Sequence, residues 1–191
     1  MQVDPLLAAA FARLGKLAVF RSPVDTWLML PCIDDMNGIL LENREWQSFF
    51  PHRFWPDHFR RLMLFGREGL YGYATVPELA GSNGRQPVVF VDPYEDIYAL
   101  PVASDLDQFF DIYSRYVEMA VQDPGYQGSG VPWVSFPYCV PEIIARERLL
   151  IGMIEEGRFD RLMYERGEGG WRREEDLAHT REWIGKILDA R

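Results

Sequence analysis

Apolar residues recur at helical spacing between Ser104 and Asp123. At about 100° per residue, these positions occupy one face of a helix. Ser104 is suited to cap the first turn together with Asp107, and the Asp-Pro-Gly sequence at 123–125 ends it. The apolar face consists of Leu106, Phe109, Phe110, Tyr113, Val117 and Ala120. The pattern therefore predicts a helix over about 104–122 that packs on a core.

Before this helix, apolar residues fall in short runs rich in β-branched and aromatic side chains, which is typical of strands. The Gly-Arg-Glu-Gly sequence at 66–69 is typical of a turn that joins two of these strands into a hairpin. Near the start, Asp4 and Pro5 are suited to begin a helix over about 5–14. The predicted strands are 16–20, 27–30, 62–65, 70–74, 87–91 and 97–102. These elements predict an α+β fold, with helices packed on a mostly antiparallel sheet.

The chain divides into three segments by composition. Residues 1–123 form the predicted α+β domain, and residues 124–140 form a loop rich in proline, glycine and aromatic residues. Residues 141–191 form a helical extension packed on the same domain, with helices over about 141–156, 159–165 and 173–189. The aromatic residues of the loop are Tyr126, Trp133, Phe136 and Tyr138. They can either pin the loop to the core or form an exposed anchor for a partner.

The net charge of −9 is concentrated in one part of the chain. Residues 86–145 hold one basic side chain, Arg115, against nine acidic ones, which is a net charge of −8. An acidic protein of this kind is a poor ligand for the phosphates of nucleic acids, but it suits a basic protein partner. No signal peptide or run of about 20 apolar residues is apparent, so we expect a cytoplasmic protein without a membrane segment. Cys32 and Cys139 lie in apolar surroundings, and we expect both to be buried free thiols.

Six acidic residues form the candidate partner-binding site. Asp107, Asp111 and Glu118 share one stripe of the predicted helix over 104–122, away from its apolar face. Asp92, Glu95 and Asp96 lie in a predicted turn before the last strand. The stripe has a simpler interpretation as a solvated helix face, and the acids of the turn have alternative interpretations as a solvated turn or a catalytic carboxylate pair.

The chain shows no recognisable pattern for a metal, a cofactor or a catalytic nucleophile. His52, His58 and His179 do not form a spaced ligand pair. Glycines at 66, 69 and 72 lack the spacing of a phosphate-binding loop. We therefore expect a protein that binds no metal or cofactor and is not an enzyme.

Residues 60–117 resemble the SUKH superfamily, which includes fungal cell-wall-assembly regulators and many bacterial immunity proteins. The resemblance rests on a glycine-bearing hairpin (64–73), a strand that ends in Asp92 (87–92), and an Ala-Ser-acid-apolar start to a helix (102–110). Leu30-Pro31 and Asn37-Gly38 of the family pattern are also present, but they lie too close together for the helix that usually separates them. The resemblance implies an α+β domain without catalytic residues that neutralises a toxin by direct binding.

Three functions therefore compete. The first is an immunity protein for a basic bacterial toxin, which combines the resemblance with the acidic charge. The second is a regulatory or scaffolding protein with an endogenous partner. The third is a hydrolase that uses the carboxylates near Asp92.

Overall fold

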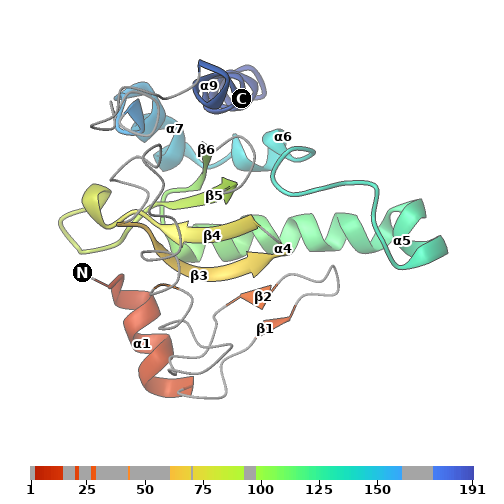
Figure 1. Cartoon of the computed structure of the whole chain (residues 1–191), viewed down its shortest axis with the longest axis horizontal. Helices are drawn as coiled ribbons and strands as arrows, with labels where there is room; N and C mark the ends of the chain where they lie inside the picture. Colours follow the sequence, from red (N-terminus) through yellow and green to blue (C-terminus); the bar gives the residue numbers. More distant parts are fainter. Residues whose placement is uncertain are drawn as a thin grey trace.

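The computed structural model describes residues 3–14, 20–21, 27–28, 43, 61–69, 71–92, 98–160 and 174–191. These residues form an α+β fold, as the sequence predicts. The described strands form one six-stranded antiparallel sheet whose strands are neighbours in chain order. Figure 1 shows α4 crossing one face of this sheet, α7 and α9 on the side of β6, and α5 beyond the far end of α4.

The strands correspond in number and order to the runs predicted from the sequence. They are β1 (Phe20–Arg21), β2 (Trp27–Leu28), β3 (Met63–Glu68), β4 (Tyr71–Thr75), β5 (Val88–Asp92) and β6 (Tyr98–Ala103). The predicted strands over 16–20 and 27–30 extend beyond β1 and β2 into residues that lie outside the described part of the chain.

The described helices also follow the predicted order, with several differences in detail. They are α1 (Pro5–Leu14), the short 3-10 helix η2 (Pro77–Leu79), α4 (Leu106–Gln122), α5 (Pro124–Ser129), α6 (Pro141–Ile144), α7 (Arg148–Glu155) and α9 (Glu174–Asp189).

The predicted loop over 124–140 is wrong at its start, because residues 124–129 form α5. The single helix predicted over 141–156 is two helices, and most of the predicted helix near 159–165 lies outside the described residues. The N-cap of α4 is Asp105 rather than Ser104.

The hairpin between β3 and β4 is tighter than the sequence predicts. The strands stay paired up to Glu68 and Tyr71, so the chain reverses within the two residues between them. Gly69 has a φ of 57°, a conformation that glycine adopts without steric cost. Gly66 and Gly72 lie inside the paired strands, so the predicted four-residue turn over 66–69 is wrong.

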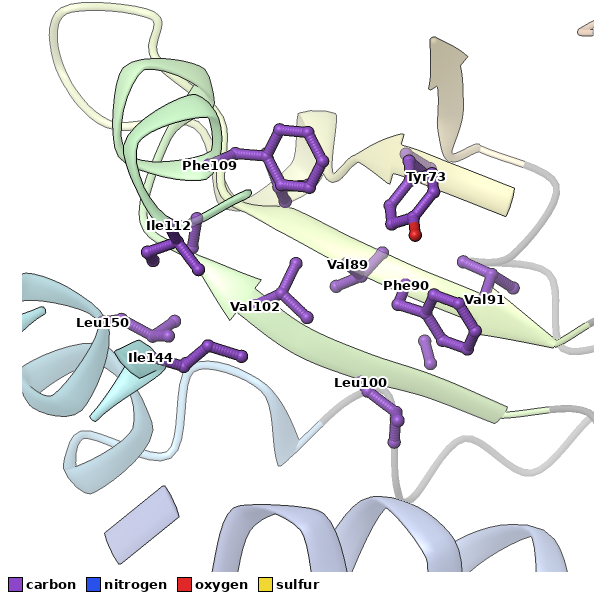
Figure 2. Packing of buried hydrophobic residues seen from close by; sticks show 14 of the residues in the cluster. Tyr73, Val89, Phe90, Val91, Leu100, Val102, Phe109, Ile112, Ile144 and Leu150 are labelled. Carbon is purple, nitrogen blue, oxygen red and sulfur yellow. The ribbon is translucent and has the colours of Figure 1, made fainter. Parts of the chain in front are cut away.

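The core is built where α4 packs on the sheet. Phe109 of α4 is fully buried, and its ring centroid lies 5.3 Å from that of Phe65 and 5.4 Å from that of Tyr73. Figure 2 shows Phe109 extending from α4 toward Tyr73, with Ile144 and Leu150 continuing the cluster. The buried face of α4 consists of Leu106, Phe109, Ile112, Tyr113, Tyr116 and Ala120. It is rotated from the predicted face, since Phe110 and Val117 are only partly buried while Ile112 and Tyr116 are buried.

The free edge of β6 is covered by α9. Thr180 Oγ1 donates a hydrogen bond to the carbonyl of Ala99 at 3.1 Å, and Trp183 Nε1 donates one to the carbonyl of Pro101 at 2.8 Å. Both side chains are buried. Pro101 has no N–H to offer to a further strand, which suits its position on an edge strand. The contacts satisfy carbonyl groups that an exposed edge would present to other chains.

We expect Phe109→Ala to lower the free energy of unfolding by about 3–5 kcal/mol, because it opens a cavity in an aromatic cluster that cannot collapse without moving α4. Phe110→Ala, one position along the same helix and partly buried, is the matched control and should cost about half as much or less. Guanidinium denaturation of both variants measures the difference. Equal losses would contradict the assignment of Phe109 to the centre of the core.

Candidate protein-interaction surface

The three acidic residues predicted on one helix stripe all lie on the exposed face of α4. Their charge is partly balanced, however. Asp107 pairs with Arg85 at 3.1 Å, and Asp111 pairs with Arg115 at 2.9 Å. Within the described part of the chain, Glu118 has no such ion pair. The negative electrostatic potential on the exposed face of α4 is therefore weaker than the net charge of residues 86–145 suggests. It is strongest near Glu118.

Of the three acidic residues predicted in a turn, the structure describes Asp92. Asp92 is the last residue of β5, paired with Tyr98 of β6, and it is only 8% exposed. It therefore does not belong to an exposed turn, which corrects the sequence prediction. The turn predicted at Asp92 begins later, because the β5–β6 ladder continues through this residue. Glu95 and Asp96 lie outside the described residues.

The aromatic segment after α4 has a buried part and an exposed part. Phe136 is buried, and its ring centroid lies 5.3 Å from that of Tyr113 and 5.4 Å from that of Tyr116. Trp133, three residues earlier, is 76% exposed, and Val131 beside it is 65% exposed. The sequence left open whether this segment is pinned to the core or forms an anchor. In the structure, Phe136 pins it and Trp133 projects from it.

Trp133 is held in place despite its exposure. Asp123 Oδ1 accepts hydrogen bonds from the N–H of Gly125 at 2.8 Å and from the N–H of Trp133 at 2.9 Å. A Cβ at Gly125 would lie 2.6 Å from Trp133 Cδ1 and 2.7 Å from its Nε1, so the indole packs directly on the glycine. The sequence predicted the Asp-Pro-Gly motif as a helix stop. It also forms the N-cap of α5, and this second role creates the platform for Trp133.

An exposed tryptophan with a constrained backbone and one fixed ring edge is suited to protein recognition. Tryptophan is enriched among the residues that contribute most to binding energy at protein interfaces. A side chain that is already positioned loses less conformational entropy when a partner covers it. We define the candidate interaction surface as Trp133 and Val131 together with the outward acids of α4, namely Asp107, Asp111 and Glu118.

The buried carboxyl of Glu147 is the most unusual titratable acid in the described part of the chain. Its Oε2 accepts a hydrogen bond from the N–H of Ser104 at 2.9 Å, a contact that coincides with the break between α6 and α7. Burial raises the pKa of Glu147, and hydrogen bonding from Ser104 offsets the rise only in part. The Ser104 hydroxyl lies close enough to influence this carboxyl but makes no hydrogen bond of normal geometry with a described residue.

His179 and Cys139, the histidine and cysteine in the described part of the chain, show no reactive grouping. His179 stacks on Tyr98 with ring centroids 4.8 Å apart, and His52 and His58 lie outside the described residues. Cys139 is an exposed free thiol, which corrects the prediction of burial, and Cys32 is not described. Among the described residues, no three histidine, cysteine, aspartate or glutamate side chains are grouped as metal ligands would be. None of the described helices has the length and apolar character needed to cross a bilayer.

Comparison with protein-family models, with curated proteins and with solved structures finds no match to this chain.

We expect Gly125→Ala to displace the Trp133 ring, because the new methyl group would overlap it. The cost of such overpacking is about 1–3 kcal/mol. The matched control is Gly128→Ala on the same helix, where a Cβ meets no atom within 4 Å. Fluorine NMR of protein labelled with 5-fluorotryptophan, with Trp133→Phe used for assignment, should show a shifted and broadened Trp133 resonance only in the Gly125 variant. An unchanged resonance would mean that the ring is not held by Gly125.

The raised pKa of Glu147 predicts a pH-dependent effect of Glu147→Gln. Below the ordinary glutamate pKa of about 4.3, the carboxyl is protonated in both the folded and the unfolded state, so the stabilities of variant and wild type differ by a constant. As the pH rises above this value, the unfolded state releases the proton more readily, and the wild type loses stability relative to the variant. Urea denaturation from pH 4 to pH 7 should show this divergence. Glu142→Gln, at an exposed carboxyl on α6, is the control for the general loss of one charge.

Proposed function

We propose that this protein is a non-enzymatic binding module that acts in the cytoplasm as an immunity protein and neutralises a basic bacterial toxin domain by direct contact. The observation that carries the proposal is Trp133, an exposed indole fixed by Gly125 and Asp123. Such a residue has no role in the core, yet the chain holds it in one position. The proposal of a toxin as the partner rests on the resemblance of residues 60–117 to the SUKH superfamily. The proposal that this partner is basic rests on the acidic charge of the chain.

Charge on α4 supports a basic partner through the rate of association. Acidic residues near the rim of an interface steer a basic partner toward it and act mainly on encounter. Asp107 and Asp111 contribute less than isolated carboxylates because Arg85 and Arg115 balance them. Glu118, nearest in sequence to the segment that carries Trp133, contributes most. In this proposal the acids guide the partner and Trp133 binds it.

The two competing functions have less support. A hydrolase centred on Asp92 would need an accessible carboxylate pair, whereas Asp92 is buried in β5. A regulatory or scaffolding role would use the same surface and differ only in the identity of the partner. A pull-down from the native host with mass-spectrometric identification, followed by co-expression with the captured protein, separates these possibilities. Rescue of cells from a toxic partner supports immunity, and capture of a harmless endogenous protein supports the regulatory role.

With the partner in hand, Trp133→Ala should weaken binding by at least thirtyfold, which corresponds to about 2 kcal/mol. The loss should come mainly from faster dissociation, since the indole makes its contacts after encounter. Leu149→Ala is the control because Leu149 is similarly exposed, at 69%, but lies on α7. Surface-plasmon kinetics measures both variants. Equal affinities of wild type and Trp133→Ala would place the docking surface elsewhere.

Charge reversal tests the other half of the surface. Changing Asp107, Asp111 and Glu118 together to lysine should slow association at least tenfold at low salt, and the effect should shrink as salt rises. The triple variant places lysines beside Arg85 and Arg115, so its folding must be checked by circular dichroism. Glu118→Lys alone avoids this repulsion and should still slow association. An unchanged rate in both variants would make α4 a solvated face without a role in docking.

A further inference from the structure

A second surface feature lies apart from Trp133 and has the opposite charge character. It is a cavity of about 300 Å³ that lies between the segment joining η2 to β5 (residues 79–85), the start of α4, and α7. Its basic wall comes from Arg85, Arg148 and Arg158, and its apolar wall from Leu79, Leu149 and Met153.

Arg158 reaches the cavity because of the way α7 ends. Gly157 has a φ of 69°, and the N–H of Arg158 bonds back to the carbonyl of Met153 at 3.0 Å. These are the features of a Schellman motif, which turns the chain back at the end of the helix. The Arg158 guanidinium then donates to the carbonyl of Leu79 at 2.9 Å. This bond fixes one edge of the guanidinium and leaves its other donors for a ligand.

The arginines of the cavity differ in how far they are neutralised. Arg85 is paired with Asp105 at 2.8 Å and with Asp107 at 3.1 Å, so its charge is already balanced. Neither Arg148 nor Arg158 has a carboxylate partner among the residues that the structure describes. Glu156 also lines the cavity and offsets part of their charge. A surplus of unpaired arginine over unpaired carboxylate remains.

Two helices begin at the same cavity. The start of α7 adds to its preference for negative charge, whereas the start of α4 presents the Asp105 carboxylate, which already accepts from the N–H of Gln108 and from Arg85. The N-cap of α4, Asp105, and the first residue of α7, Arg148, both line it. Helix N-termini carry positive partial charge on their first N–H groups. The donors of the cavity therefore match an oxyanion, and its apolar wall matches a nonpolar group attached to that oxyanion.

We propose that this cavity binds a small organic oxyanion, a phosphate monoester or a carboxylate, with the charged group at Arg148 and Arg158 and the nonpolar part against Leu79, Leu149 and Met153. The planar guanidinium group can bind either a phosphate or a carboxylate in a bidentate manner, through two parallel N–H···O hydrogen bonds. The volume of about 300 Å³ lies at the small end of ligand pockets and suits a compact molecule. This site does not involve Trp133, so failure of ligand binding leaves the role of Trp133 unaffected. It meets the candidate interaction surface only at Asp107, which pairs with Arg85.

Titration of the ¹⁵N-labelled protein with phenyl phosphate, benzoate, inorganic phosphate and phenol tests the proposal by NMR. Phenyl phosphate, benzoate or both should give saturable shifts at the amides of Gly81, Arg148, Gly152 and Arg158, and should bind at least tenfold more tightly than phenol. Preference for phenyl phosphate identifies the ligand as a phosphate ester, and preference for benzoate identifies it as a carboxylate. Equal binding of phenol, or the absence of saturable shifts at these amides with both organic anions, would overturn the proposal.

Variants separate recognition by the cavity from attraction to any surface arginine. Arg148→Gln and Arg158→Gln should each weaken the preferred organic anion at least fivefold. Arg148 is exposed, so its variant should fold normally even if loss of the Leu79 contact perturbs the Arg158 variant. Arg146→Gln is the matched control, because Arg146 is an exposed arginine outside this cavity. Leu149→Ala should weaken phenyl phosphate or benzoate but not inorganic phosphate. Equal weakening by the Arg146 and Arg148 variants would show nonspecific charge attraction and overturn the proposal.

Discussion

Packing of α4 on the sheet through one aromatic cluster is the contact on which the other features of this protein depend. Phe109 and Tyr113 of α4 meet Tyr73 of the sheet and Phe136 of the segment that follows the helix, with ring centroids between 5.3 and 6.1 Å apart. The cluster thus joins three parts of the chain that are distant in sequence. Because its rings are buried, their contribution comes from removing a large apolar area from water, with edge-to-face contacts adding to it.

The position of the candidate interaction surface follows from this cluster. Burial of one face of α4 turns Asp107, Asp111 and Glu118 outward. Burial of Phe136 fixes the end of the aromatic segment, while Asp123 fixes its beginning through two backbone N–H groups. Trp133 lies between these two fixed points and is 76% exposed. The same packing that stabilises the fold therefore also holds the candidate anchor.

Polar contacts complete the framework at positions where the sheet and helices end. Asp4 accepts hydrogen bonds from the N–H of Leu6 and of Gln86, so it caps α1 as predicted and also ties it to the segment before β5. Asn43 exchanges two hydrogen bonds with the backbone of Leu64 in β3, and α9 covers β6. Each contact satisfies a buried backbone group that would otherwise destabilise the fold. Together they join α1, Asn43 and α9 to the sheet.

The sequence by itself determined the α+β class, the positions of the strands along the chain, the start of α1 and the outward stripe of α4, because periodicity and capping are local properties that neighbouring residues decide. It could not determine the burial of Asp92, the rotation of the α4 face toward Ile112 and Tyr116, or the break before α7, since these depend on contacts between distant segments. The candidate site divides in the same way. Its acidic residues were visible in the sequence as a charge pattern. The ion pairs of Arg85 with Asp105 and Asp107 were not, because Arg85 lies at the end of residues 1–85, a segment with no net charge. The exposure of Trp133 was undecided in the sequence, and only the tertiary structure resolved it, because a tryptophan is buried or exposed according to the space that the packed core leaves for it.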